Sequence, residues 1–458
     1  MKETNDIIIY RYFVKGKLTL KSPLVLGCGE NSNSDKDISR NWQGEVFIPS
    51  TSIAGAVRHY LDSILEKDSG EENKLIRQIL GETEEDSKQS IITFYDGEGM
   101  ENAVINIRDG VLIKPIYRVA EKHAKFNYEI LEPGASCRFR IELIYRANPE
   151  NSNNILEIEN LLYLILMGFS TGDIRLGAKN ARGFGEVKLS DLIILKLDMK
   201  EKEERLQWLE FTWDGFTSGN IQLNELRNNL LNIVQNKTNI KVEFIIPYSI
   251  LIRSPNPNPN EEDVTHLSSM GKSVISGTSW TGALRNAIFE AARCLDKVDQ
   301  ANLIVEKLFG FAKTKKQEPN YEERAQKSRI FIKESIIQSN ESHRQTMASY
   351  THNKIDRFTG GTVDSALFTV KPSFGGFVIL DITIFNAMKY EIGLVLLGIK
   401  ELWHGLQPIG GTTNVGRGIL SGSKLFIDDK EFTASDIDVG FTEILEDYLI
   451  SLANKYNN

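Results

Sequence analysis

The chain carries Ile48-Pro49-Ser50-Thr51-Ser52-Ile53-Ala54-Gly55-Ala56-Val57-Arg58 near its start, and a related sequence, ISGTSWTGALR, at residues 275–285. Six of the eleven aligned positions are identical, at a constant offset of 227 residues. Hydroxyl residues open each stretch and apolar residues follow at helical spacing, a pattern typical of a helix start. The sequence therefore predicts the same helix twice.

Two further matches follow in the same order. Residues 79–81 (ILG) parallel 308–310 (LFG), and the glycine-rich residues 176–185 parallel 409–418. Three ordered matches indicate an internal duplication. We expect a first domain at 1–200, a second domain at 239–458, and a helical linker at 201–238.

Each half has the same predicted order of elements, β-α-β-β-α-β, which is that of a ferredoxin-like or RNA-recognition fold. Alternating apolar residues predict the strands and a 3.6-residue spacing predicts the helices. The predicted fold class is α+β, with the glycines between the second helix and the last strand. The expected segments are 7–13 and 16–26, 90–94, 137–145, 156–168 and 185–195, then 240–252, 329–332, 376–384, 390–405 and 418–427.

Composition excludes several classes of protein. The 458 residues include 54 Lys and Arg against 62 Asp and Glu, a formal charge of −8, which argues against a uniformly cationic nucleic-acid binder but not against a local basic groove. The longest apolar stretch, residues 161–167, is far shorter than a membrane helix. Three widely spaced cysteines and no apolar N-terminal segment favour a protein of the reducing cytoplasm.

These motifs resemble the RAMP superfamily of CRISPR-associated proteins, whose domains carry β-hairpin insertions called thumbs. Residues 355–368 (IDRFTGGTVDSALF) resemble the thumb signature of one branch, and the first half has a reduced version at 107–110 and 126–129. The chain is most similar to the tandem, double backbone subunits of type III-D effector complexes. The resemblance implies partners: a guide RNA, a complementary target RNA, other backbone subunits and a large polymerase-like subunit, with no membrane.

The resemblance also implies cleavage of the target RNA at two sites, one per domain. Attack by a ribose 2′-hydroxyl requires a group that manages its proton, and stabilisation of the phosphorane charge, commonly by a divalent metal. The family places an aspartate between the first strand and the first helix, which here corresponds to Asp35, with Asp37 as a rival, and to Asp263. Without the family, an aspartate in a polar loop is a turn former or a solvated charge. One carboxylate cannot form a metal cage, so Mg²⁺ or Mn²⁺ would bind weakly and only with RNA.

Further residues are candidates for contact with RNA. The helix starts offer hydroxyls and backbone N–H groups that suit a phosphate, although the same residues serve as ordinary helix caps. The glycine loops let a phosphate approach backbone amides, and Phe184 there is a candidate for stacking on a base or for the core. The candidates are Ser50, Thr51, Ser52, Arg58, Lys179, Arg182, Phe184, Thr278, Ser279, Arg285 and Arg417, with Arg357 and Thr359 in the thumb.

Two other functions remain open at this point. The runner-up is a guide-binding scaffold of the same complex whose loops are catalytically inert. A metabolic enzyme on a duplicated ferredoxin-like fold lacks any recognisable nucleotide or metal motif. His266, three residues after Asp263, is a candidate for assisting proton transfer, against the alternative of a locally bonded histidine.

Overall fold

The chain forms two compact units in the computed structural model. Unit 1 comprises residues 1–107, 127–180 and 184–235, and unit 2 comprises 108–126, 181–183 and 236–458. The structure describes residues 7–27, 37–66, 73–82, 89–114, 119–147, 155–228, 231, 233, 236–255, 262–295, 298–311, 326–428, 430–437 and 446–457. Two short segments of the first half of the sequence, 108–126 and 181–183, thus belong to unit 2.

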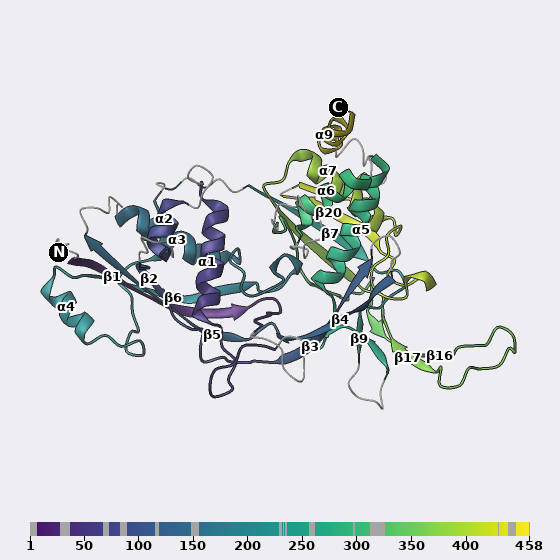
Figure 1. Cartoon of the computed structure of the whole chain (residues 1–458), viewed down its shortest axis with the longest axis horizontal. Helices are drawn as coiled ribbons and strands as arrows, with labels where there is room; N and C mark the ends of the chain where they lie inside the picture. Colours follow the sequence, from purple (N-terminus) through teal and green to yellow (C-terminus); the bar gives the residue numbers. More distant parts are fainter. Residues whose placement is uncertain are drawn as a thin grey trace, which may run out of the picture. The chain divides into compact units, whose positions relative to one another are not determined.

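Unit 1 is an antiparallel sheet of four strands with helices on one face (Figure 1). The strand order is β2-β5-β1-β6, as the β-α-β-β-α-β order predicts. Its elements are β1 (Ile7–Leu20), α1 (Ser50–Ile64), α2 (Lys74–Leu80), β2 (Ile92–Phe94), β5 (Ser136–Ala147), α3 (Ile155–Thr171) and β6 (Val187–Asp198). Side chains on one face of a strand recur every two residues, and those on one face of a helix recur every three or four residues. Accordingly Tyr12, Val14 and Leu18 of β1 and Val57 and Leu61 of α1 all point into the core of unit 1.

The first strand is one continuous element rather than the two predicted segments. The register of β1 against β6 shifts between Lys15 and Lys17. A Cβ at Gly16 would lie 2.9 Å from the backbone oxygen of Ser190, so a glycine is needed where the strands approach at this bulge. The bulge keeps the chain in the sheet where the sequence pattern suggested a break.

Unit 2 repeats this architecture with the strand order β13-β19-β7-β20-β21. Its helices include a buried Trp280, which packs on Phe244 at 5.9 Å between ring centroids. The main elements are β7 (Lys237–Ile245), α5 (Gly277–Leu295), α6 (Val298–Phe309), β13 (Ile330–Ile332), β19 (Phe377–Phe385), α7 (Lys389–Trp403), β20 (Ser421–Ile427), β21 (Lys430–Thr433) and α9 (Glu446–Asn457). The predicted fold class, two ferredoxin-like modules in tandem, is confirmed.

Each module carries an insertion of extended chain. In the first, β3 (Ile105–Lys114) and β4 (Val119–Leu131) form a two-stranded hairpin, although the sequence signature there is reduced. In the second, a four-stranded sheet has the order β16-β17-β10-β9. Its strands are β9 (Arg253–Pro255), β10 (Val264–His266), β16 (Tyr350–His352) and β17 (Phe368–Lys371). The small strands of unit 2 are β8 (Ser249–Ile250), β11 (Ser268–Ser269), β12 (Lys272–Ile275), β14 (Ser335–Ile336), β15 (Thr346–Met347) and β18 (Ser373–Phe374).

The predicted helical linker is largely not helical. Helix α4 (Lys202–Leu209) forms in the charged run, but in the helix expected at 223–234 the described residues are a 3-10 turn, Leu223–Leu226, and the non-helical residues 227, 228, 231 and 233. Aromatic residues between these elements pack instead on the sheet face of unit 1 opposite the helices, with Phe211 stacked on Phe13 at 3.9 Å. This burial of aromatic surface explains why the segment stays extended.

Among the residues that the structure describes, no helix is long and apolar enough to cross a membrane.

Candidate nucleic-acid interface

The two glycine-rich loops have the same backbone geometry at an offset of 233 residues. In the first loop, the N–H of Leu176 donates to the carbonyl of Gly185 at 2.9 Å, and Ile409 and Gly418 form the same bond at 2.9 Å. A left-handed residue then precedes a single 3-10 turn: Lys179 with φ +60°, and Thr412 with φ +56°. The duplication therefore preserves a backbone conformation and not only a composition.

Phe184 corrects one prediction. Its side chain is only 1% exposed and packs with Val25, Tyr128 and Ile130, so the ring is a core residue and is not presented to a base. The offset of 233 places Arg417 at the equivalent position in the second loop. Its Nη1 atom is buried with no hydrogen-bond partner among the described residues, which leaves a cation beside the second glycine loop.

Lys179 and Arg182 lie on the first loop with different surroundings. The ammonium of Lys179 lies over the ring of Tyr128, 3.1 Å from its centroid, so this cation is held on an aromatic face. Arg182 is exposed, and it belongs to unit 2. Its backbone lies against the start of α5, since a Cβ at Gly277 would be 2.1 Å from the carbonyl oxygen of Arg182.

Arg285 lies within unit 2 close enough to Arg182 for their charges to interact. Burial and then the charge of Arg182 lower the pKa of the Arg285 guanidinium, and Glu306 opposes this effect. Two guanidinium groups that repel one another favour the binding of an anion between or beside them. The predicted residues Arg182 and Arg285, from different halves of the sequence, thus belong to one basic cluster.

Arg58, the counterpart of Arg285 in the sequence repeat, has a structural role in this conformation. Its guanidinium donates to the carbonyl of Gly81 at the end of α2. This bond satisfies a carbonyl at a helix C-terminus. Arg58 is therefore bonded to the protein in unit 1, unlike the exposed Arg182.

The helix starts also differ between the halves. The backbone N–H of Ser50 donates to Asp96 Oδ1 at 2.6 Å, so a carboxylate already occupies the N-terminus of α1 beside Thr51 and Ser52. At α5, the Ser276 hydroxyl lies 2.9 Å from that of Thr278 and 3.0 Å from that of Ser279. The second start keeps a cluster of hydroxyl groups with no carboxylate bonded to it among the described residues, so it suits a phosphate better than the first.

Asp263 lies at the junction of the loop with the thumb sheet. Its side chain is exposed, and Oδ2 accepts a hydrogen bond of 2.7 Å from the backbone N–H of Thr369 in β17. Neighbouring Glu262 pairs with Lys371 at 3.1 Å, and hydrogen bonds from Ser349, its own backbone and Lys371 lower its pKa to about 2. A backbone bond therefore holds Asp263 next to the thumb, and an ion pair holds its neighbour.

In the first half, Asp35 lies outside the described residues. Its rival Asp37 is half-buried at the start of a segment held by Glu129, which accepts from the N–H of Ile38 at 3.0 Å. The choice between Asp35 and Asp37 stays a prediction.

The tip of the second thumb is a compact turn. The Asp356 carboxylate accepts from the N–H groups of Phe358 and Thr359 and from the Thr359 hydroxyl at 3.0 Å. Backbone bonds from Thr359 and then Phe358 lower the pKa of Asp356. The Thr359 hydroxyl proton is therefore committed to the turn, whereas Arg357 is exposed and the Phe358 ring is 100% exposed.

His266 is buried and cannot reach a proton on a bound substrate in this conformation, which corrects the proton-transfer hypothesis. Nδ1 lies 3.2 Å from the backbone nitrogen of Ile252 and 3.1 Å from the carbonyl oxygen of Ile250, and Nε2 lies 3.0 Å from the carbonyl oxygen of Val274. Backbone groups therefore contact both ring nitrogens. Burial lowers its pKa to about 4, opposed by its bonds to backbone carbonyls.

We expect the stability of unit 2 to fall as the pH is lowered from about 6.5 towards 4. The unfolded chain binds a proton at His266 near pH 6.5 and the folded chain only near pH 4, so acid favours unfolding by up to about 3 kcal/mol. Urea unfolding at intervals between pH 7 and pH 4.5 measures this dependence. The His266→Gln variant should show a flatter profile, and parallel profiles would contradict the assignment.

Arg253 is a residue that sequence reasoning missed. It pairs with His266 across β9 and β10, and its side chain lies against the second glycine loop, since a Cβ at Gly411 would be 2.8 Å from its Nε. Its exposed guanidinium adds a second cation beside Arg417 on this loop. The sequence signal for Arg253 was weak: it follows the short apolar run 250–252.

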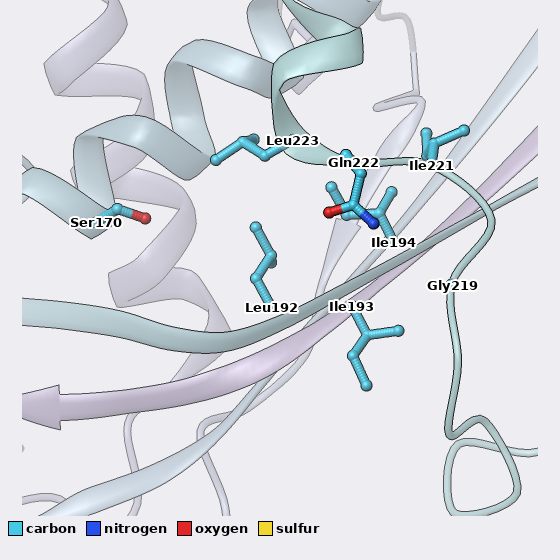
Figure 2. A pocket seen from close by; sticks show the side chains of 8 residues that line it. All are labelled: Ser170, Leu192, Ile193, Ile194, Gly219, Ile221, Gln222 and Leu223. Carbon is cyan, nitrogen blue, oxygen red and sulfur yellow. The ribbon is translucent and has the colours of Figure 1, made fainter.

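A cavity of about 420 Å³ in unit 1 brings together none of the predicted residues. Figure 2 shows that β6, the end of α3 and the extended linker surround it. Its lining is Ser170, Leu192, Ile193, Ile194, Gly219, Ile221, Gln222 and Leu223. With no charged side chain in its lining, the cavity is not suited to RNA backbone.

In the described part of the chain, no three His, Cys, Asp or Glu side chains are grouped to hold a metal ion. A single exposed carboxylate such as Asp263 supplies one or two oxygen ligands, which fits a cation only when RNA phosphate and water complete its shell.

Comparison with known families identifies the superfamily of the chain. The family model described as RAMP superfamily matches residues 17–188 and 243–421, more than half of the chain. Each matched segment contains a helix start, an insertion and a glycine loop. No curated protein matches the chain.

Proposed function

Because the chain belongs to the RAMP superfamily, which supports a CRISPR-associated RNA-binding subunit, we propose that it is a tandem backbone subunit of a type III, III-D-like effector complex. In this role it binds guide RNA along both modules and cleaves complementary target RNA at two sites. The partners are the guide, the target, other backbone subunits and a large polymerase-like subunit.

One observation carries the proposal: the sheet of β9, β10 and β17 links Asp263 to both the glycine loop and the thumb. Arg253 in β9 lies on Gly411, and Thr369 in β17 donates to Asp263. An RNA strand that contacts Arg253 and Arg417 beside the glycine loop would thus pass close to the carboxylate.

The chemistry follows from these groups. The 2′-hydroxyl oxygen of one nucleotide attacks the adjacent phosphorus, its proton leaves, and the bond to the 5′-oxygen breaks. Asp263 is suited to accept or orient that proton because it is exposed and held by a backbone donor. A divalent cation, bound with the RNA, would supply stabilisation of the negative charge on the phosphorane. Arg253, Arg417, Arg182 and Arg285 would hold phosphates and set the register of the strand.

The test is cleavage by the assembled complex loaded with guide and end-labelled complementary RNA. We expect Asp263→Ala to remove one product band and Asp35→Ala to remove another. Asp37→Ala is made separately and in combination with Asp35→Ala, because Asp37 is the alternative residue for the first site. Mg²⁺ should be required for both bands. Glu341→Ala, an exposed carboxylate of unit 2, is the matched control and should leave both bands.

Two outcomes separate the alternatives. Unchanged cutting in the Asp35→Ala, Asp37→Ala, Asp263→Ala triple variant, with target binding intact, would leave a guide-binding scaffold. Absence of RNA from the purified complex would contradict the whole proposal. Retention of guide should fall steeply with salt, and less steeply after replacement of Arg182 or Arg417, since fewer phosphates are then neutralised.

A further inference from the structure

A tight turn presents a large apolar side chain to solvent just before the first helix of each module. In unit 1 the turn spans residues 41–45 and carries Trp42, whose side chain is 91% exposed. In unit 2 the turn joins β11 and β12 and carries Met270, which is 53% exposed. Trp42 precedes Ser50 at the start of α1 by eight residues, and Met270 precedes Gly277 at the start of α5 by seven.

The Trp42 turn is held by its own hydrogen bonds. The Asn41 side chain accepts from the N–H groups of Gln43 at 3.0 Å and Glu45 at 2.9 Å, and the N–H of Gly44 donates to the Asn41 carbonyl at 2.9 Å. None of these bonds involves the indole. The ring is thus displayed on a preorganised turn.

The base of this turn is anchored next to Asp37. Arg40 pairs with Glu129 of β4 at 3.1 Å, and Glu129 also binds the N–H of Ile38. Arg40 and Val46 are bridged as antiparallel partners. The segment from Asp37 to Trp42 therefore has fixed contacts along its length.

The second turn has the same relation to its aspartate. Ser268 pairs with Ser273 and Ser269 with Lys272, which leaves Met270 and Gly271 at the tip with φ +49° and +74°. Positive φ at both tip residues is typical of a tight two-residue β-hairpin turn. Met270 follows Asp263 by seven residues, and Trp42 follows Asp35 by seven residues and Asp37 by five.

We propose that Trp42 and Met270 contact a nucleobase of the target RNA beside each candidate cleavage loop and so position the strand. This inference rests on the proposed function. An exposed indole on a rigid turn can stack on a base without the entropic cost of ordering a flexible segment. Every base offers a π-face, so this contact suits a guide-directed protein that must accept every target sequence. A methionine offers a smaller, polarisable contact of the same kind. Exposed apolar side chains at matching places in both modules favour a repeating ligand such as RNA over a unique protein partner.

The test uses the assembled complex and a target with 2′-deoxyribose at the cut positions, so that binding is measured without cutting. A 2-aminopurine is placed in turn at each position around the first cut. We expect one position to be quenched in the wild type and restored in Trp42→Ala, with Trp42→Phe retaining most of the quenching. Target affinity should fall roughly 10-fold in Trp42→Ala, and Gln43→Ala on the same turn is the control.

Cleavage of an all-ribose target gives the second readout. Trp42→Ala should raise the KM or lower the kcat of the first cut while the second cut is unchanged, and Met270→Ala should do the reverse with a smaller effect. Quenching, affinity and cutting equal to wild type in Trp42→Ala, while the wild type binds and cuts, would overturn this inference and leave the proposed function standing. If Trp42→Ala prevents assembly of the complex but the unassembled protein binds RNA as before, Trp42 contacts another protein subunit. That result would also overturn this inference. If the wild type binds no RNA, the proposed function itself is wrong.

Discussion

Replacing Gly418 or Gly185 by alanine is expected to destabilise the corresponding module by about 3 kcal/mol or more. Both glycines have φ near +77°, and a Cβ would lie 1.9 Å from a backbone oxygen, that of Ile409 for Gly418 and that of Leu176 for Gly185. The residue that carries each oxygen also donates its N–H to the carbonyl of the same glycine. The backbone therefore cannot move away from the new Cβ without breaking the hydrogen bond that closes the loop. Chemical unfolding of the two variants measures the loss.

The duplication provides a matched control for this prediction. Gly55 in α1 and Gly282 in α5 occupy equivalent positions of the repeat, and a Cβ at either meets nothing within 4 Å. Alanine there should stabilise the protein by roughly 0.5–1 kcal/mol, because glycine is a poor helix former. If Gly418→Ala unfolds at the same denaturant concentration as Gly282→Ala, the loop geometry described above is wrong.

Local sequence pattern predicted most of the fold because strands and helices impose their own periods. The helices α1, α3 and α7 and most strands of the two main sheets lie within a few residues of their predicted positions, but β1 and β7 end six and seven residues before their predicted ends and β21 was not predicted. The helix predicted over Leu223 to Val234 did not form in the described residues, where Leu223, Leu226 and Leu231 instead pack on the core of unit 1. A sequence pattern does not contain that long-range competition.

The candidate site was predictable in its residue types but not in its contacts. The approach of Asp263 to Thr369 joins positions more than a hundred residues apart, and it depends on how the thumb strand pairs with β10. Phe184 was misassigned because a core aromatic and an exposed one look alike beside a glycine loop. The exposure of Trp42 could have been predicted, because an aromatic residue surrounded by turn-forming residues indicates a side chain displayed on a turn.

Breaking the ion pair between Arg108 and Glu334 is expected to destabilise unit 2 by about 3–5 kcal/mol. Arg108 lies in β3 of the first insertion, within the segment that belongs to unit 2, and the two side chains are only 4% and 9% exposed. Two parallel bonds join them, one of 3.1 Å from Nη2 to Oε1. Arg108→Met leaves a buried carboxylate without its cation, and Glu334→Gln leaves a buried guanidinium without its anion.

A double-mutant cycle distinguishes this pair from an exposed one. The Arg108→Met, Glu334→Met double variant should recover much of the stability lost in either single variant, since a buried apolar pair needs no compensating charge. The pair of Lys17 and Glu101 in unit 1, at 2.6 Å but with side chains 43% and 62% exposed, should change stability by less than about 1 kcal/mol when Lys17→Met is made. Equal losses of stability in Arg108→Met and Lys17→Met would show that water reaches the Arg108–Glu334 pair. In that case the ion pair would not hold Arg108 of the first insertion against Glu334. A loss confined to the buried pair would instead mean that the base of the first insertion is fixed by charge, as the thumb of the second module is fixed through Glu262 and Lys371.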